Sequence, residues 1–174
     1  MDEIGMWHTG VMPDNINPDH DTIRAQVLWG SLLAGAAGVE WYFGARYEGN
    51  DLSTEDWRSR ENMWDQTRYA LDFFNQNLPF WEMKPADDLL EETEGYCIAK
   101  PGEIYAVYLP IGTKEPQFSL EDSENTYSVE WYNPRAGGQL INGNITEISG
   151  MGIQPLGNPP VDPEKDWVVL IRMK

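Results

Sequence analysis

The stretch that decides the fold runs from Ile23 to Gly44 and reads IRAQVLWGSLLAGAAGVEWYFG. Apolar residues at helical spacing fill its first part, and small Gly and Ala residues follow, as expected where a helix end approaches a sheet closely. Residues 39–43, VEWYF, then predict a short strand that ends in polar and aromatic side chains. The stretch therefore predicts one helix-to-strand step of a layered α/β arrangement.

A second helix is predicted downstream, over residues 55–77. The apolar residues assigned to its core face are Trp57, Trp64, Ala70, Leu71, Phe74 and Leu78. Pro79 ends the helix, because proline removes a backbone donor and clashes with the preceding turn. Since a repeat of seven residues is typical of a packing face, we interpret the two tryptophans as core residues rather than ligand-stacking residues.

Beyond residue 95 the pattern changes from helical to alternating, with turn residues between short apolar runs. Strands are predicted at residues 96–99, 104–109, 117–120, 127–132, 139–141, 145–148 and 167–173. Many short strands in about eighty residues are typical of an antiparallel sandwich. Residues 104–109 are apolar on both faces, which predicts a central strand.

Composition limits the classes of function. The formal net charge is -17, which argues against nucleic acid or an anionic membrane surface as the partner. A single cysteine, Cys97, excludes an internal disulfide and a thiolate metal cluster, and no sequence motif for a cofactor or a metal is present. Tryptophan and tyrosine scattered among carboxylates suit carbohydrate, whose C–H faces stack on aromatic rings.

Four segments carry a resemblance to a known family. They are GSLLAGAAGVEWYFG (residues 30–44), EDWRSRENMWDQTRYALDFF (55–74), KPGEIYAVYLP (100–110) and VEWYNPRAGG (129–138). They resemble a bacterial family of glycoside-hydrolase-like proteins with an apiosidase-like (β/α)₈ barrel, followed by a small β-sandwich labelled a collagen-binding domain.

The resemblance implies an α+β chain in two parts. Residues 1–85 correspond to the truncated end of the barrel, with its last helices and strand, and residues 86–174 to an antiparallel β-sandwich accessory domain. On this mapping residues 39–43 are the eighth barrel strand, and residues 55–77 are the last barrel helix. The parent protein is expected to be secreted or periplasmic and to act on glycosidic bonds of polysaccharides.

The same mapping places a catalytic carboxylate at Glu3, at the end of the seventh strand, as nucleophile or general base. Glycoside hydrolysis needs two carboxyl groups across the bond, and the strand that supplies the other is absent from this chain. We therefore expect the 174 residues alone to be inactive, which leaves the enzyme assignment open.

Residues near the predicted barrel mouth are candidates for substrate binding, and they are Asp2, Trp7, His8, His20, Glu40 and Tyr42. For the two histidines, a surface role is the alternative. Glu40 is expected to point inward, with a salt bridge to Arg46 or Arg58 as the alternative.

Two further patterns have structural explanations beside functional ones. Asn15, Asn17, Asp19 and Asp21 alternate as in a calcium loop, but they lack its central glycine and its final glutamate, so turns and helix capping are preferred. Arg135, at a strand-to-turn junction, is a candidate clamp for a carboxylate from the barrel side.

Two rival functions remain. The first is a non-catalytic β-sandwich module that binds carbohydrate or a matrix protein, which would show a row of exposed aromatic residues on one sandwich face. The second is a purely structural accessory domain. Barrel helices without their strands would also expose apolar faces, which predicts self-association.

Overall fold

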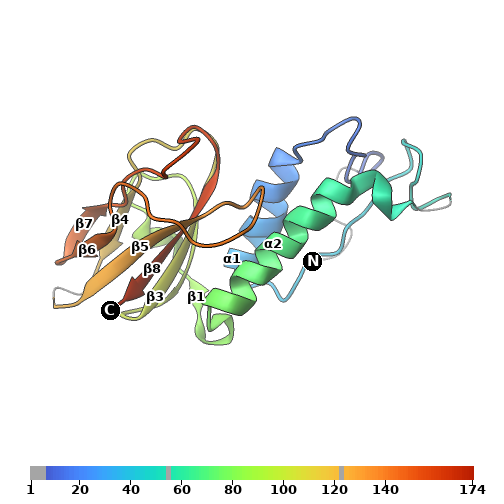
Figure 1. Cartoon of the computed structure of the whole chain (residues 1–174). Helices are drawn as coiled ribbons and strands as arrows, with labels where there is room; N and C mark the ends of the chain where they lie inside the picture. Colours follow the sequence, from blue (N-terminus) through green and yellow to red (C-terminus); the bar gives the residue numbers. More distant parts are fainter. Residues whose placement is uncertain (1–6, 54–55, 122–123) are drawn as a thin grey trace.

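The computed structural model describes residues 7–53, 56–121 and 124–174. Its centre is a six-stranded antiparallel sheet in the order β1-β2-β3-β8-β5-β6 (Figure 1). These strands are β1 (Lys84–Pro85), β2 (Tyr96–Lys100), β3 (Ile104–Leu109), β8 (Trp167–Met173), β5 (Thr126–Tyr132) and β6 (Glu147–Ser149). A second, two-stranded sheet pairs β4 (Gln117–Leu120) with β7 (Gly152–Pro155).

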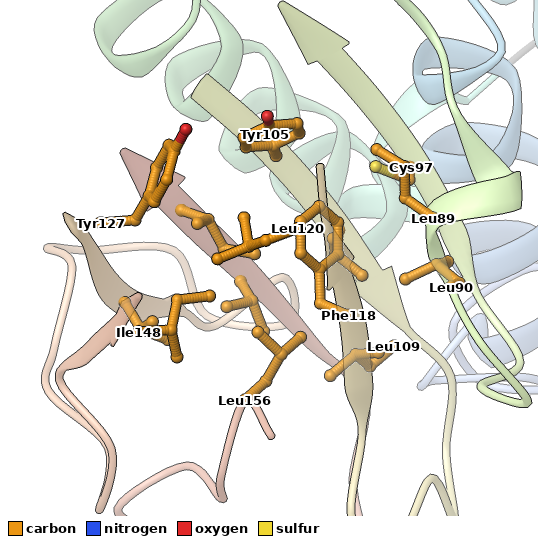
Figure 2. Close-up of a cluster of buried hydrophobic side chains, with 14 of the residues drawn as sticks. Leu89, Leu90, Cys97, Tyr105, Leu109, Phe118, Leu120, Tyr127, Ile148 and Leu156 are labelled. Carbon is orange, nitrogen blue, oxygen red and sulfur yellow. The ribbon is translucent and has the colours of Figure 1, made fainter. Parts of the chain in front are cut away.

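The two sheets enclose the first hydrophobic core, whose members include Tyr105, Phe118, Leu120 and Ile148 (Figure 2). The ring of Phe118 meets the ring of Tyr105 edge-on, with centroids 5.0 Å apart. Alternate residues of β3 point to opposite faces, so Tyr105 and its same-face neighbours enter this core. The coarse prediction of an α+β chain with antiparallel, sandwich-like layers is confirmed.

Helices cover the other face of the large sheet (Figure 1). They are a π-helical segment (Ile23–Trp29) that continues into α1 (Gly30–Leu33), and the long helix α2 (Glu61–Asn77). Trp29 is fully buried between them, stacked on Tyr108 of β3 at 5.8 Å and meeting Phe73 of α2 edge-on at 5.6 Å. The helices and the sheet therefore share one continuous core, and β3 is buried on both faces, as predicted for a central strand.

The strand predicted at residues 39–43 is wrong. The backbone there is not part of a ladder: Trp41 makes only a single bridge, and the Val11 N–H donates to the Tyr42 carbonyl at 2.7 Å. A strand persists only where a neighbour pairs along its length, and the described residues offer none here. Within the described ranges every named strand belongs to the two antiparallel sheets, so they do not show the end of a parallel barrel.

The predicted core face of α2 is also wrong in part. Trp57 and Leu71 are 51% and 47% exposed, whereas Met63, Ala70 and Phe73 are buried. Trp64 and Leu71 lie one residue, about 100° around the helix, from the buried Met63 and Ala70. Trp57 precedes α2, in the 3-10 helix Trp57–Arg60, so α2 begins at Glu61 rather than at the predicted residue 55. The seven-residue spacing was correct for a helix, but the contact with the sheet selected the adjacent face.

Most predicted strands in the second half of the chain are confirmed, with small shifts. The exception is residues 139–141, where only Ile141 pairs, by a single bridge to Trp131. The predictions missed β1 and β7, because Pro85 and Pro155 are unfavourable in a central strand and mark turns more often. Pro85 lies in β1, at the edge of the large sheet, and Pro155 lies in β7, in the two-stranded sheet. In both positions the missing backbone N–H is tolerated.

Candidate functional site

The structure brings three of the predicted substrate-binding residues together. The Tyr42 hydroxyl donates to the Trp7 carbonyl at 2.6 Å, and the rings of Trp7 and His8 lie 4.6 Å apart. Trp7 is 80% exposed, so this corner presents an indole to solvent. The predicted catalytic Glu3 and its neighbour Asp2 lie outside the described residues.

The other two candidates lie in different surroundings. His20 is fully buried, and its Nε2 lies 2.7 Å from an Asp14 carboxylate oxygen, so the surface alternative for this histidine is wrong. Glu40 is exposed, and no ion pair joins it to another described residue, so the alternative salt bridge to Arg46 or Arg58 is not seen in the described ranges. In the parts of the chain that the structure describes, no group of three acidic, histidine or cysteine side chains could hold a metal ion.

The strongest polar feature is a buried ionic junction between the helical layer and the sheet. Asp166, which precedes β8, is fully buried, and Arg24 is 1% exposed. Arg24 Nε donates to Asp166 Oδ2 at 2.6 Å, and its Nη2 donates to Asp166 Oδ1 at 3.0 Å. The Tyr108 hydroxyl donates to the same Oδ2 at 2.6 Å. The carboxylate is therefore held by a bidentate guanidinium and a phenol, which is a strong and geometrically specific arrangement.

The charges of this junction stabilise one another. Burial raises the pKa of Asp166, but the hydrogen bonds and charge of Arg24 outweigh burial and hold that pKa below its usual range. Burial likewise opposes the charged form of Arg24, and pairing with Asp166 raises its pKa nonetheless. Desolvation raises the pKa of the Tyr108 hydroxyl, so it stays protonated and donates. Arg24 and Asp166 are thus both charged at neutral pH, and the Tyr108 hydroxyl is neutral.

Arg135 completes the junction from the sheet side. Its Nη1 lies 3.1 Å from Asp166 Oδ1 and also donates to the Asp166 carbonyl. The turn that carries it is shaped by the Asn133 side chain, which accepts from the Arg135 N–H at 2.9 Å. Arg135 does clamp a carboxylate, but that carboxylate belongs to the same half of the chain, which corrects the prediction. The contact across the two halves is made by Arg24.

The sequence interpretation missed Arg24, Asp166 and Tyr108. One signal was present: Arg24 lies four residues before Leu28, on the apolar side of its helix. A charged residue on such a face needs a buried partner. That partner is 142 residues away in the chain, so no local pattern could identify it.

A polar cavity of about 240 Å³ opens beside the junction. Its walls come from the loop before the π-helical segment, from the first half of α2, and from the residues around Arg135 and Lys165. Its charged residues are Asp19, Asp21, Asp65, Arg24, Arg135 and Lys165. The cavity therefore mixes acceptors and donors of both charges.

An apolar groove of about 380 Å³ lies at the other end of α2. Its lining includes the buried side chains of Leu32, Phe74 and Ile98. The groove is also lined by Phe80 and Trp81, whose rings meet edge-on at 5.2 Å, and Trp81 is 72% exposed. Small residues 35–37 form one side, so a partner can approach the backbone closely there.

A wider hollow of about 500 Å³ lies between the loops around Asp14, Tyr47 and Arg58. Nearby, Arg60 is fully buried; its Nε donates to the Val11 carbonyl at 3.0 Å, and its Nη1 donates to the Gly49 carbonyl at 2.8 Å. Its guanidinium also lies 4.5 Å from the centre of the Phe43 ring. These contacts fix the loops around the hollow, so Arg60 has a structural role.

The exposed aromatic residues are not on the sandwich. Every aromatic side chain of β3, β4, β5 and β8 is at most 3% exposed. In the described ranges the exposed large aromatic residues are Trp7, Trp57, Phe80 and Trp81. The aromatic row expected of a binding sandwich is therefore not seen there, and the aromatic surfaces precede residue 85. In the described ranges, the helices fall short of the length and apolar character that a membrane span needs.

Comparison with known families defines the class of this protein. The family model described as "Putative collagen-binding domain of a collagenase" matches residues 85–172, from the second residue of β1 almost to the end of β8. This is half of the chain, and the chain belongs to this family. The match does not extend to residues 1–84 and gives no support to a glycoside-hydrolase barrel. No curated protein matches the chain.

Proposed function

We propose that this chain is a non-catalytic binding module that attaches to a proline-rich, collagen-type protein chain through the apolar groove at Trp81. The observation that carries the proposal is the exposed Phe80–Trp81 pair beside an apolar groove. Membership of a family described as collagen-binding supports the same class of partner.

The chemistry of the groove suits such a partner. Collagen strands are polyproline-II-like, and grooves lined with aromatic rings bind that conformation because a preformed helix loses little entropy. The apolar side chains of Leu71, Phe80 and Trp81 offer flat contact area, and Gly35 and Ala36 leave room for a strand to lie close. Among all the residues that line the groove, only Ile98 lies within the family match at residues 85–172. The matched region therefore supplies the sheet on which the groove rests.

The proposal also fits the surroundings of a matrix partner. A collagen-type chain lies outside the cell, so of the two expected locations of the parent protein we propose secretion. Within this proposal, residues 86–174 form the sandwich, and residues 1–85 supply the contact surface. The alternative is that a second copy of this chain fills the same groove. Light scattering of the chain alone would reveal that self-association.

The test is surface plasmon resonance of the 174-residue chain on immobilised triple-helical collagen, with heat-denatured collagen as a second surface. Trp81→Ala removes the exposed indole, and hot-spot tryptophans cost at least about 2 kcal/mol, a loss of roughly 30-fold in affinity. Trp57→Ala is the matched control, because Trp57 is also exposed but does not line the groove.

Three outcomes would overturn parts of this proposal. Absence of binding to either surface would refute the collagen-type partner, and a polysaccharide panel would then examine the carbohydrate alternative. Equal effects of the two tryptophan changes would refute the groove. If Ile153→Ser on β7 weakened binding and Trp81→Ala did not, the contact surface would lie on the small sheet, where Ile153 is 55% exposed.

The catalytic alternative is a glycoside-hydrolase fragment with Glu3 as its carboxylate. One observation favours it: Trp7, His8 and Tyr42 do gather at one corner, as a sugar-binding site would need. Hydrolysis also requires a second carboxylate across the bond, and none of the described residues is assigned to that role. A screen with chromogenic glycosides, comparing the chain with Glu3→Gln, would establish it if activity appeared and disappeared with the substitution.

A further inference from the structure

The polar cavity beside the Arg24–Asp166 junction is a second candidate binding site, distinct from the groove. The cavity draws on the first half of α2, at Asp65 and Tyr69, whereas the groove draws on the second half, at Leu71 and Phe74. A ligand in one site therefore leaves the other free.

The cavity has a rigid polar wall. Arg24 is fixed by Asp166, by the Asp21 carboxylate at 2.5 Å and by the Asp19 carbonyl at 2.6 Å. Burying such an ion pair costs desolvation free energy, and apolar replacements are often as stable. The charged groups of this wall are therefore held in fixed positions beside the cavity.

The remaining polar groups supply donors and acceptors in balance. The exposed Lys165 makes no ion pair with another described residue, and Asp65 keeps its side chain 48% exposed while it pairs with Arg68. Gln66 is 6% exposed, and its Oε1 has no hydrogen-bond partner in the described structure. That oxygen is itself buried, so the accessible side chains of Asp65 and Lys165 are the ones that a ligand in the cavity can reach.

We propose that this cavity binds a neutral sugar ring. A hydroxyl both donates and accepts, so a polyol matches a site that mixes carboxylates with Arg135 and Lys165 better than a simple anion or cation does. The volume of about 240 Å³ is smaller than the roughly 300–1,000 Å³ of pockets for drug-sized ligands, so the cavity fits a single ring.

The experiment is saturation-transfer NMR of the 174-residue chain with the methyl glycosides of glucose, galactose, mannose and xylose. A ligand of this size gives a Kd on the order of 1 mM, so each glycoside is titrated to about 20 mM. We expect at least one to saturate the signal. We also expect the Kd to stay the same when salt rises from about 0.05 M to about 0.5 M, because the ligand carries no charge.

Two variants assign that binding to the cavity. Asp65→Asn and Lys165→Met each remove a charged hydrogen-bond partner, which should weaken binding by roughly tenfold. Asp72→Asn is the matched control, because Asp72 is 49% exposed, pairs with the same Arg68 and does not line the cavity. Melting curves check that each variant is folded, and Trp81→Ala should leave glycoside binding unchanged.

The proposal is wrong if none of the four glycosides binds, or if binding survives both cavity substitutions. It is also wrong if binding weakens strongly with salt and inorganic sulfate competes, because the site would then be an anion site. Since collagen binding depends on Trp81 and sugar binding on Asp65 and Lys165, failure of one proposal leaves the other testable.

Discussion

Removal of the buried carboxylate Asp166 should destabilise the whole molecule. In Asp166→Ala, Arg24 remains buried but loses its bidentate partner, and the Tyr108 hydroxyl loses its acceptor. Breaking a buried ion pair from one side costs about 3–5 kcal/mol, because the other charge stays desolvated. In a chain of 174 residues each kcal/mol lowers the Tm by about 2–4 °C, so we expect a decrease of roughly 6–20 °C.

The assay is thermal unfolding followed by far-UV circular dichroism and by tryptophan fluorescence. Because Trp29 lies in the core shared by helices and sheet, both signals should report one transition at one temperature. Asp72→Ala is the control, since its pair with Arg68 is exposed and 3.8 Å long, and such surface pairs contribute about 0–1 kcal/mol.

A double-mutant cycle tests whether the lost stability comes from the unpaired charge of Arg24. If Arg24→Met is made in the Asp166→Ala background, the unpaired buried charge disappears, and part of the lost stability should return. The reasoning is refuted if Asp166→Ala melts within about 2 °C of the unchanged protein, less than 1 kcal/mol on this scale. It is also refuted if the two signals separate into distinct transitions, because the junction would then not link the two layers.

Three further predictions concern acid stability, backbone geometry and thiol reactivity. The pKa of Asp166 is lowered in the folded state, so the ionised carboxylate stabilises the fold above its unfolded pKa of about 3.9, and this stabilisation is lost as the pH falls below that value. The difference in unfolding free energy between the unchanged protein and Asp166→Asn, measured by urea titration, should therefore shrink below about pH 4. Gly137→Ala should be clearly less stable than Gly138→Ala in the same titration. Both glycines have a positive φ, but only at Gly137 would an added Cβ lie 2.4 Å from the Tyr69 ring. Equal losses of stability in the two variants would contradict the clash. Cys97 is fully buried, and desolvation raises the pKa of its thiol. A thiol reagent should therefore modify Cys97 in urea and leave it unmodified in the folded chain. Rapid modification without denaturant would contradict the buried position of this side chain.

The sequence determined the features that depend on short-range physics. The two-faced apolar pattern of residues 104–109 identified a central strand, because side chains alternate and only a strand covered on both sides is apolar at every position. The end of α2 before Pro79 followed from proline's missing donor, whereas its start, at Glu61 rather than at residue 55, did not follow from helical spacing. Turn residues separated the later strands for similar local reasons.

The tertiary structure decided what depends on partners distant in the chain. Residues 39–43 have the composition of a strand, but no described neighbour pairs along them, and a strand without a ladder does not form. Leu71 fits the helical repeat as well as Ala70 does, yet only the contact with the sheet settled which of the two is buried. The Arg24–Asp166 junction joins residues 142 apart, and the cavity beside it exists only once that contact is made. Local sequence sets backbone conformation, whereas burial and charge pairing depend on which surfaces meet when the chain folds.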